Sequence, residues 1–226
     1  MDNDFQHITL PDIYRKVKFF LIPYLVILMA CLTIKCIYTR EQIYFAVNGL
    51  NTSWGDFIFP YITNLGDGLA LIVLALIIAL FSLRKAFLLL TAYGFTSLVA
   101  QALKYIFDLP RPYLYFKTQV AHMHLVKGVY MLSYHSFPSG HTVTAFSACV
   151  TLAYLFRNKW LDLLMLAIAL LIGYSRMYLS EHFFEDVTAG SAVGVFGTLF
   201  WLYWFDNFRF MHRGKFQSGL LKKAGG

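Results

Sequence analysis

Residues 65–83 read LGDGLALIVLALIIALFSL, and this stretch decides the fold class. Asp67 is its only charged residue, and the rest is almost entirely aliphatic. A helix needs about 20 apolar residues to cross a hydrocarbon core of about 30 Å. The stretch therefore predicts a transmembrane helix.

The composition of the whole chain agrees with this prediction. Of its 226 residues, 58% are hydrophobic and 14% are charged, whereas soluble domains contain about 45–50% apolar and about 25% charged residues. This excludes a disordered chain and an ordinary soluble enzyme. The three cysteines, Cys31, Cys36 and Cys149, have no paired spacing and indicate neither a disulfide framework nor a zinc site.

Five further apolar runs have the length and composition of membrane helices. They cover residues 19–37, 87–107, 142–156, 160–178 and 187–205, and the run at 142–156 is the shortest. No repeat or linker divides the chain. We therefore expect one all-α membrane domain over residues 1–226, built as a bundle of six transmembrane helices.

The basic residues predict how the bundle is oriented. If the segment 1–18 and the tail 206–226 share one side, that side receives twelve of the 19 Lys and Arg residues. Basic residues favour the cytoplasmic side, so we expect both termini in the cytoplasm. The net charge of +7 then reflects topology, and no nucleic-acid partner is implied.

The opposite, outer side holds two long connections. Residues 38–64 mix aromatic and polar side chains, which indicates short amphipathic helices at the membrane interface. Residues 108–141 form a long loop that includes His122, His124 and His135. We interpret these three histidines as polar loop residues that flank a substrate, in preference to a metal site.

Three polar patches fall at the outer ends of the predicted spans. They are Lys104 with Arg111-Pro112, then Pro138-Ser139-Gly140-His141, and then Ser175-Arg176 with His182 and Asp186. Ionisable groups at this depth are costly and indicate function. Lysine and the arginine fork suit phosphate oxygens, and the start of the fourth span offers backbone amides beside Gly140. The patches together predict a phosphate cradle.

Two histidines can supply a reaction in this cradle. His182 and Asp186 are four residues apart and share a face if a helix begins near residue 183. A carboxylate on one ring nitrogen leaves the other free as a nucleophile, and His141 can protonate a leaving oxygen. The scheme needs no metal, and no cluster of carboxylates suggests a Mg²⁺ site.

The pattern K-x6-RP, PSGH and SR-x5-H-x3-D resembles that of the type 2 phosphatidic acid phosphatases (PAP2). Eleven positions match in order between Lys104 and Asp186. The superfamily also contains vanadium haloperoxidases, bacterial acid phosphatases and glucose-6-phosphatase. The segment from Ile62 to Asp67 resembles the membrane branch more weakly.

The resemblance implies a role for each matched residue. His182 would attack phosphorus and form a phosphohistidine, Asp186 would orient it, and His141 would protonate the leaving group and then help to activate water. The phosphoryl oxygens would be bound by the remaining matched residues, which are Lys104, Arg111, Ser139, Gly140 and Arg176. No cofactor is implied.

The expected function is that of a metal-independent lipid phosphatase, with its active site on the outer face of the cytoplasmic membrane. Undecaprenyl pyrophosphate is slightly preferred as the substrate, with phosphatidylglycerophosphate, phosphatidic acid and lipid A as other candidates. Two alternatives remain: a vanadate-dependent haloperoxidase, and a polytopic transporter or lipid-binding protein without activity. The oligomeric state is not predicted.

Two further motifs receive structural interpretations. Glu181 and Glu185 adjoin the histidine pair, and we expect both to be solvated at the surface. Gly190 and Gly194 form a G-x-x-x-G motif, which we expect to pack inside the bundle rather than at a dimer interface.

Overall fold

The computed structural model describes residues 7–212 and 214–221. Over these residues the chain is helical, with no strand. The α-helices are α1 (Leu10–Ile37), α2 (Arg40–Asn48), α3 (Ser53–Asn64), α4 (Gly68–Phe81), α5 (Leu83–Phe107), α6 (Pro112–Tyr115), α7 (Gly140–Phe156), α8 (Lys159–Tyr178), α9 (Phe184–Phe205) and α10 (Gly214–Gln217), and the 3-10 helices are η1 (Val120–His122) and η2 (Arg209–His212). Residues 1–6 of the predicted N-terminal segment, and Arg213 and 222–226 of the predicted tail, lie outside the described residues.

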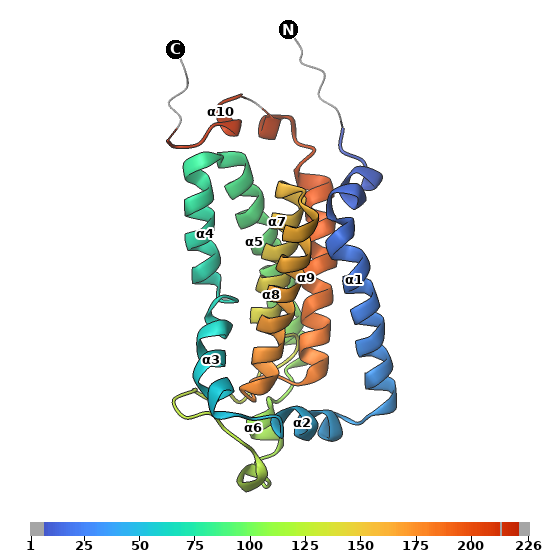
Figure 1. Ribbon diagram of the computed structural model, residues 1–226, viewed down its shortest axis with the longest axis vertical. Helices are drawn as coiled ribbons and strands as arrows, with labels where there is room; N and C mark the ends of the chain where they lie inside the picture. The colour runs from blue at the N-terminus through green and yellow to red at the C-terminus, as the bar shows by residue number, and fades with distance from the viewer. Residues whose placement is uncertain (1–6, 213, 222–226) are drawn as a thin grey trace.

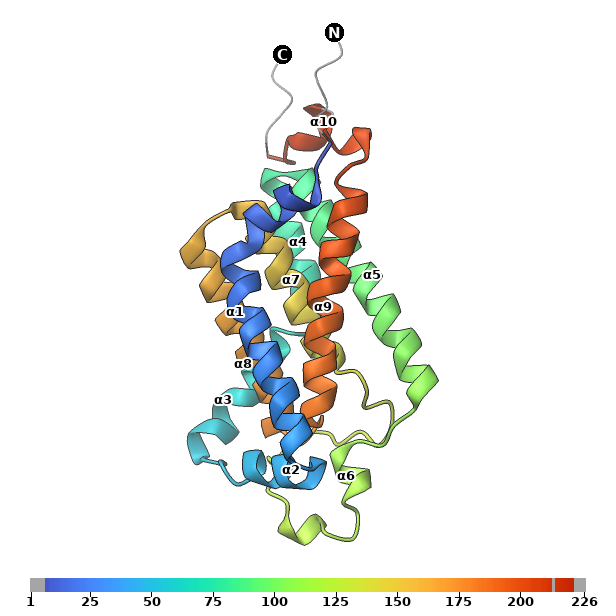
Figure 2. The ribbon, with the colours of Figure 1, turned by 90° about the vertical axis from the view of Figure 1, so that its right-hand side faces the viewer.

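The long helices form an elongated bundle whose two ends differ (Figures 1 and 2). The start of α1, the end of α9 and α10 lie at one end, called here the terminal end. The short helices α2 and α6 and the long loop after α6 lie at the other end, called here the loop end. Both ends of the described chain therefore meet on one side of the bundle, as the predicted topology requires.

Helix α7 is the central element of the bundle and contacts α1, α4, α5, α8 and α9. Its interior position means that its hydroxyl side chains must find partners within the bundle. The hydroxyl of Thr151 donates to the backbone oxygen of Ser147 (2.8 Å), and Thr198 of α9 donates to the hydroxyl of Ser147 (2.8 Å). Buried hydroxyls bonded in this way cost little.

Four helices, α1, α5, α8 and α9, are long and apolar enough to cross a membrane, and the bent pair of α3 and α4 could provide a fifth span. Helix α7, at 17 residues, is shorter than such a span. The described helices thus support four or five spans by length, one or two fewer than the predicted six. Helix α1 also begins nine residues before the predicted span, where Thr9 and Asp12 form a capping box.

Helices α2 and α3 form where interfacial helices were predicted, and their position at a membrane interface stays a prediction. Helix α3 does not stand apart from the bundle, because it joins α4 as one helix pair bent by 56°. The break carries Gly66, where an added Cβ would lie 3.0 Å from the backbone oxygen of His141 and 2.6 Å from a methyl carbon of Ile172. Glycine is needed here because the broken backbone lies against α7 and α8.

The two glycines of the G-x-x-x-G motif pack α9 directly against α7. An added Cβ would lie 2.8 Å from the backbone oxygen of Ser139 at Gly190, and 2.8 Å from that of Val143 at Gly194. The expectation of packing inside the bundle is confirmed. This contact fixes the start of α7 relative to the start of α9.

Candidate functional site

A cavity of about 320 Å³ lies among α4, α5, α7 and α8 near the loop end. Six of the eight predicted site residues line it, namely Lys104, Arg111, Gly140, His141, Arg176 and His182. They come from separate segments of the chain and meet as the predicted orientation of the helices required. Ser139 and Asp186 do not contribute to the wall.

His182 lies in the turn between α8 and α9 and is almost completely buried (2% exposed). Burial, reinforced by the positive charges of Arg111 and Arg176, lowers the pKa of His182 well below its usual value. The imidazole is therefore neutral at pH 7, which leaves one ring nitrogen with a free lone pair.

The carboxylate of Asp186 stabilises this turn together with the hydroxyl of Ser136, a residue that the sequence analysis did not identify. Its Oδ2 accepts hydrogen bonds from the Ser136 hydroxyl (2.5 Å) and the Phe183 backbone amide (2.9 Å), and lies 3.5 Å from Nδ1 of His182. The Ser136 hydroxyl is itself 3.4 Å from that nitrogen. Helix α9 begins at Phe184, so His182 stands just outside the helix that was expected to align it with Asp186.

Glu181 joins the two arginines of the cavity. Its Oε2 lies 2.5 Å from Nη1 of Arg111 and 3.2 Å from Nη2 of Arg176, and the residue is 5% exposed. The expectation that Glu181 is solvated is therefore wrong. The positive φ of Ser180 (57°) reverses the chain and directs Glu181 inward. Glu185 is also paired, with Lys35 and Arg40, so the same expectation is wrong there.

The two guanidinium groups keep hydrogen-bonding capacity beyond Glu181. Arg111 donates from Nε to the backbone oxygen of Tyr134 (3.1 Å), and no partner is recorded for its Nη2. Arg176 donates from Nη1 to the hydroxyl of Thr63 (2.7 Å), and its buried Nε has no partner in the described part of the chain. Burial lowers the pKa of Arg111 while Glu181 opposes the shift, so the group stays charged. Both arginines are held in place with donors still available for an anion.

The start of α7 forms another side of the cavity. Gly140 is its first residue, and Nζ of Lys104 would lie 3.7 Å from a Cβ placed there. Ser139 caps the helix but is fully buried, and its hydroxyl accepts a hydrogen bond from Thr142 (2.9 Å). The lysine and the backbone amides of the first turn thus face the same space, with Ser139 behind them.

His141 follows Gly140 and faces the break between α3 and α4. Its Nε2 lies 4.0 Å from Oδ2 of Asp67, a residue that also lines the cavity. Asp67 caps α4 by accepting a hydrogen bond from the amide of Leu69 (2.8 Å). The bent helix pair therefore brings a carboxylate close to the second histidine.

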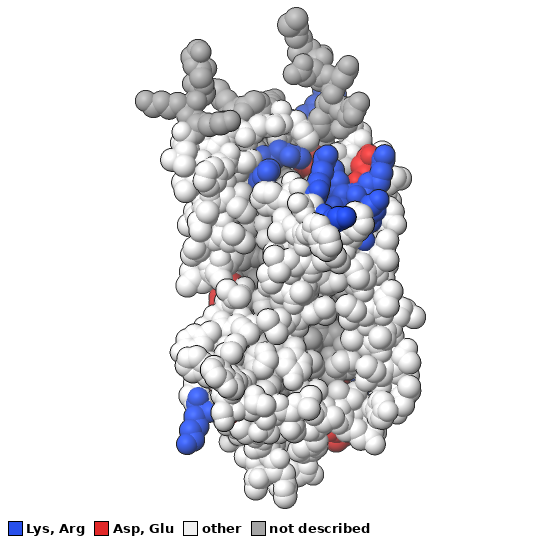
Figure 3. All heavy atoms as spheres, in the orientation of Figure 1, with Lys and Arg blue, Asp and Glu red and all other residues white. Residues whose placement is uncertain are grey.

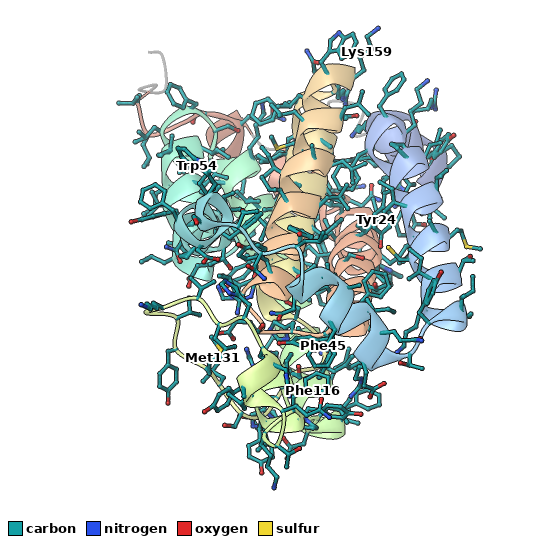
Figure 4. The ribbon with its side chains drawn as sticks, turned by 60° about the horizontal axis from the view of Figure 1, so that its bottom comes forward. Tyr24, Phe45, Trp54, Phe116, Met131 and Lys159 are labelled. Carbon is teal, nitrogen blue, oxygen red and sulfur yellow. The ribbon has the colours of Figure 1, made fainter. Side chains whose placement is uncertain are left out.

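Helix α2 supports the turn that carries His182. The hydroxyl of Ser180 bonds to the Tyr44 hydroxyl (2.8 Å) and to Nδ2 of Asn48 (3.2 Å). The ring of Tyr44 also packs within an aromatic cluster formed with Phe45, Phe116 and Phe183. Figure 4 shows Phe45 and Phe116 together at the loop end. This cluster covers the turn and keeps it dry.

The loop histidines do not come together. His124 bonds through Nε2 to the carboxylate of Asp56 (2.9 Å), and His135 lies 3.1 Å from Asp108. Within residues 7–212 and 214–221, no three His, Cys, Asp or Glu side chains are grouped as metal ligands.

The geometry allows a defined chemistry. Three cations, two of them fixed by a shared carboxylate, surround a space that also receives amides at the start of a helix. A neutral imidazole on one side can attack phosphorus, and a second imidazole can exchange a proton with a leaving oxygen. Sequence reasoning missed Ser136, Glu181 and Thr63, since nothing in their spacing showed that they support this arrangement.

Comparisons with known proteins identify the family of the chain. The family model of the PAP2 superfamily matches residues 85–210. A lipid A 4'-phosphatase of Bacteroides thetaiotaomicron is 38% identical over 69 residues, which cover 30% of this chain and 30% of that protein. Phosphatidylglycerophosphatase B of Bacillus subtilis is 28% identical over 197 residues, covering 80% of this chain and 90% of that protein.

A solved structure shares the fold. The crystal structure of Aquifex aeolicus LpxE superimposes with a TM-score of 0.66 at 26% identity, covering 73% of this chain and 94% of that chain. The family model spans more than half of the sequence and includes every cavity residue from Lys104 to His182. This chain is therefore an integral membrane protein that belongs to the PAP2 superfamily.

Proposed function

We propose that this protein is a membrane lipid phosphatase that works through a phosphohistidine at His182. The observation that carries the proposal is a buried histidine in the wall of a cavity that also holds Lys104, Arg111 and Arg176. Several relatives that match the chain are named phosphatases of lipid substrates, although one is named a bacitracin transport permease. The presence of long apolar helices argues against a soluble haloperoxidase.

The proposed reaction has two displacement steps. In the first, one ring nitrogen of His182 bonds to phosphorus as the bond to the lipid oxygen breaks, and His141 donates a proton to that oxygen. In the second, His141 accepts a proton from water, whose oxygen displaces the histidine and releases inorganic phosphate. The three cations and the amides near Gly140 stabilise the charge on the phosphoryl oxygens in both transition states.

The charges of the cavity suit a phosphate anion. Its three cations outnumber the two carboxylates beside them, Glu181 and Asp67, which leaves a net positive charge. The wall includes parts of α4 and α5, and Leu69 and Leu98 on these helices are exposed. We infer that the lipid tail remains in the bilayer and that its head enters between α4 and α5.

The proposed topology places the loop end outside the cytoplasmic membrane and counts α7 and the bent α3–α4 pair as spans, six in all. Lys and Arg gather near the terminal end, as Figure 3 shows on one face, and basic residues favour the cytoplasm.

The test is phosphate release in detergent from a panel of lipid substrates: lipid A, phosphatidylglycerophosphate, phosphatidic acid and undecaprenyl pyrophosphate. We expect release from at least one of them, inhibition by vanadate, and full activity in EDTA. Bromination with vanadate and no release from any lipid would overturn the proposal. A requirement for Mg²⁺ after EDTA treatment would overturn the metal-independent mechanism.

A further inference from the structure

A second and larger cavity, of about 610 Å³, opens at the terminal end of the bundle, far from His182. Its wall is strongly basic, with five cationic side chains: Arg15, Lys16, Arg84, Arg157 and Lys159. Asp12 and Asp162 are the carboxylates of the wall. Figure 3 shows part of this basic surface near the upper end of the molecule.

Some of these cations are already neutralised within the protein, and others are not. Arg15 pairs with Asp12 (2.6 Å), and Arg84 forms a two-pronged pair with the buried Asp206. By contrast, Arg157 and Lys159 are exposed. Lys159 lies over the ring of Trp160 (5.0 Å to its centre), and among the described residues neither cation forms an ion pair with a carboxylate. The cavity therefore presents two uncompensated positive charges to a ligand.

Lys16 shows how closely the cations are held. Its Nζ donates to the hydroxyl of Tyr154 (2.9 Å) and lies 4.0 Å from the centre of that ring. Tyr154 in turn donates to Asp206 (2.5 Å). The ammonium group of Lys16 is thus fixed by its hydrogen bond to Tyr154, which is itself bonded to Asp206.

Asp162 adds a second requirement for the ligand. The residue lies in the first turn of α8 and is 1% exposed, yet its Oδ1 has no hydrogen-bond partner among residues 7–212 and 214–221. A buried carboxylate oxygen without a donor is costly. A ligand that satisfies this wall therefore carries a negative group for the cations and a hydrogen-bond donor for Asp162.

The neighbouring surface indicates where such a ligand comes from. Phe19 belongs to the cavity wall, and Ile22 and Val26 follow it on the same face of α1 at spacings of three and four residues. All three side chains are exposed (44%, 49% and 66%). An apolar stripe therefore runs from the cavity toward the middle of the membrane, in the position that acyl chains would occupy.

We propose that this cavity binds the headgroup of an anionic glycerophospholipid in the leaflet opposite the catalytic site. The phosphate would lie between Arg157, Lys159 and Lys16, a headgroup hydroxyl would donate to Asp162, and the acyl chains would follow the stripe on α1. Phosphatidylglycerol has both required groups. As a phosphodiester, it differs from the phosphomonoesters and pyrophosphates that the proposed activity would cleave.

Native mass spectrometry of the full-length protein in detergent tests this site. The probe is phosphatidylglycerol, compared with phosphatidylcholine, which has a phosphate but no net charge and no headgroup donor. The test variant combines Arg157→Asn and Lys159→Gln, because asparagine tolerates the left-handed backbone at position 157 (φ 51°). The matched control, Lys117→Gln with Lys127→Gln, removes the same charge from the loop end.

We expect the wild type to retain phosphatidylglycerol in preference to phosphatidylcholine. The test variant should lose about tenfold or more in affinity, while the control keeps it. Size-exclusion chromatography and thermal melting establish that both variants are folded. Equal retention by the test variant would overturn the proposal, as would loss caused by Arg176→Gln instead, because the lipid would then sit in the other cavity. Protection from melting by inorganic phosphate alone, with no effect of the lipid, would also overturn it.

Discussion

Two buried carboxylates hold arginines at opposite ends of the same bundle, and the comparison shows what makes one end reactive. Asp206 at the terminal end accepts two hydrogen bonds from Nη2 of Arg84 (2.5 and 2.6 Å) and one from Tyr154. Glu181 at the loop end joins Arg111 and Arg176. Asp206 binds one arginine through both carboxylate oxygens, whereas one oxygen of Glu181 joins two arginines, and each carboxylate lies next to a basic cavity.

The difference lies in what surrounds each pair. At the loop end, a buried neutral histidine and the first amides of α7 share the cavity with the arginines. The terminal cavity is also lined by the first turns of long helices, α5 and α8 among them, and its wall includes His7 and His212, but neither of these histidines is buried. A cluster of positive charge therefore accounts for binding an anion. The proposed reaction also needs a buried nucleophile beside that cluster.

The largest expected effect comes from removing the proposed nucleophile at the loop end. His182→Ala should lower kcat/KM for lipid phosphate release by about 10⁴-fold or more, because no other group can form the covalent intermediate. Phosphate release from purified, folded protein measures it. His124→Ala is the control, since His124 bonds to Asp56 outside the cavity. Activity near that of the wild type in His182→Ala would refute the nucleophile assignment.

The next largest effect is expected from replacing each of the two buried carboxylates by its amide. Glu181→Gln and Asp206→Asn should each lower the free energy of unfolding by about 3 kcal/mol, because each leaves buried arginine charge uncompensated. Thermal or denaturant melting in detergent measures this loss. Glu181→Gln should also lower kcat/KM per folded molecule by about tenfold, and Asp206→Asn should lower it much less. Equal catalytic losses would show that the two pairs do not differ in function.

A smaller effect is expected when the hydroxyl of Ser136 at the loop end is removed. Ser136→Ala removes the hydroxyl that donates to Asp186 and lies beside His182. The loss of one such hydrogen bond costs about 1 kcal/mol, so we expect a fall of about five- to tenfold in kcat with little change in KM. Steady-state kinetics separates the two parameters. Ser133→Ala serves as the control in the same loop, and a rise in KM alone would contradict the positioning role of Ser136.

The last effect concerns the pH dependence of stability. The pKa of His182 is lower in the folded protein than the usual value of about 6.5 in the unfolded chain, so the unfolded state binds more protons in acid. This contribution to stability is complete above about pH 7.5 and falls by about 1.4 kcal/mol by pH 5.5. Melting at several pH values, with His182→Gln as the reference, measures it. If His182→Gln loses as much stability in acid as the wild type, the titration of His182 is not the cause of that loss.

Much of the fold followed from local sequence signals. The apolar runs located the long helices, and the basic residues correctly placed the start of α1 and the end of α9 on one side of the bundle. The length of α1 was underestimated because its first two turns are polar on one side, with Arg15, Lys16 and Lys18 near the helix start. Hydropathy also could not show that α3 and α4 form one bent pair.

The cavity residues were predictable because motif and topology agreed. Lys104, Arg111, Gly140, His141, Arg176 and His182 share one wall. The residues that support the cavity wall were not predictable, and the reason is physical. Glu181 points inward only because Ser180 adopts a positive φ, and Ser136 reaches Asp186 through an irregular loop. Neither conformation has a periodic signature in the sequence.

The contact of Gly190 and Gly194 with α7 has a consequence for genetic screens. These glycines place the start of α9 against the start of α7, and the amide of Ser139 donates to the backbone oxygen of Asp186 (3.0 Å). A bulky residue at either glycine would separate the two halves of the reaction centre without touching a reacting group. Null alleles at Gly190 and Gly194 would therefore have the phenotype of an active-site lesion, although they are packing defects.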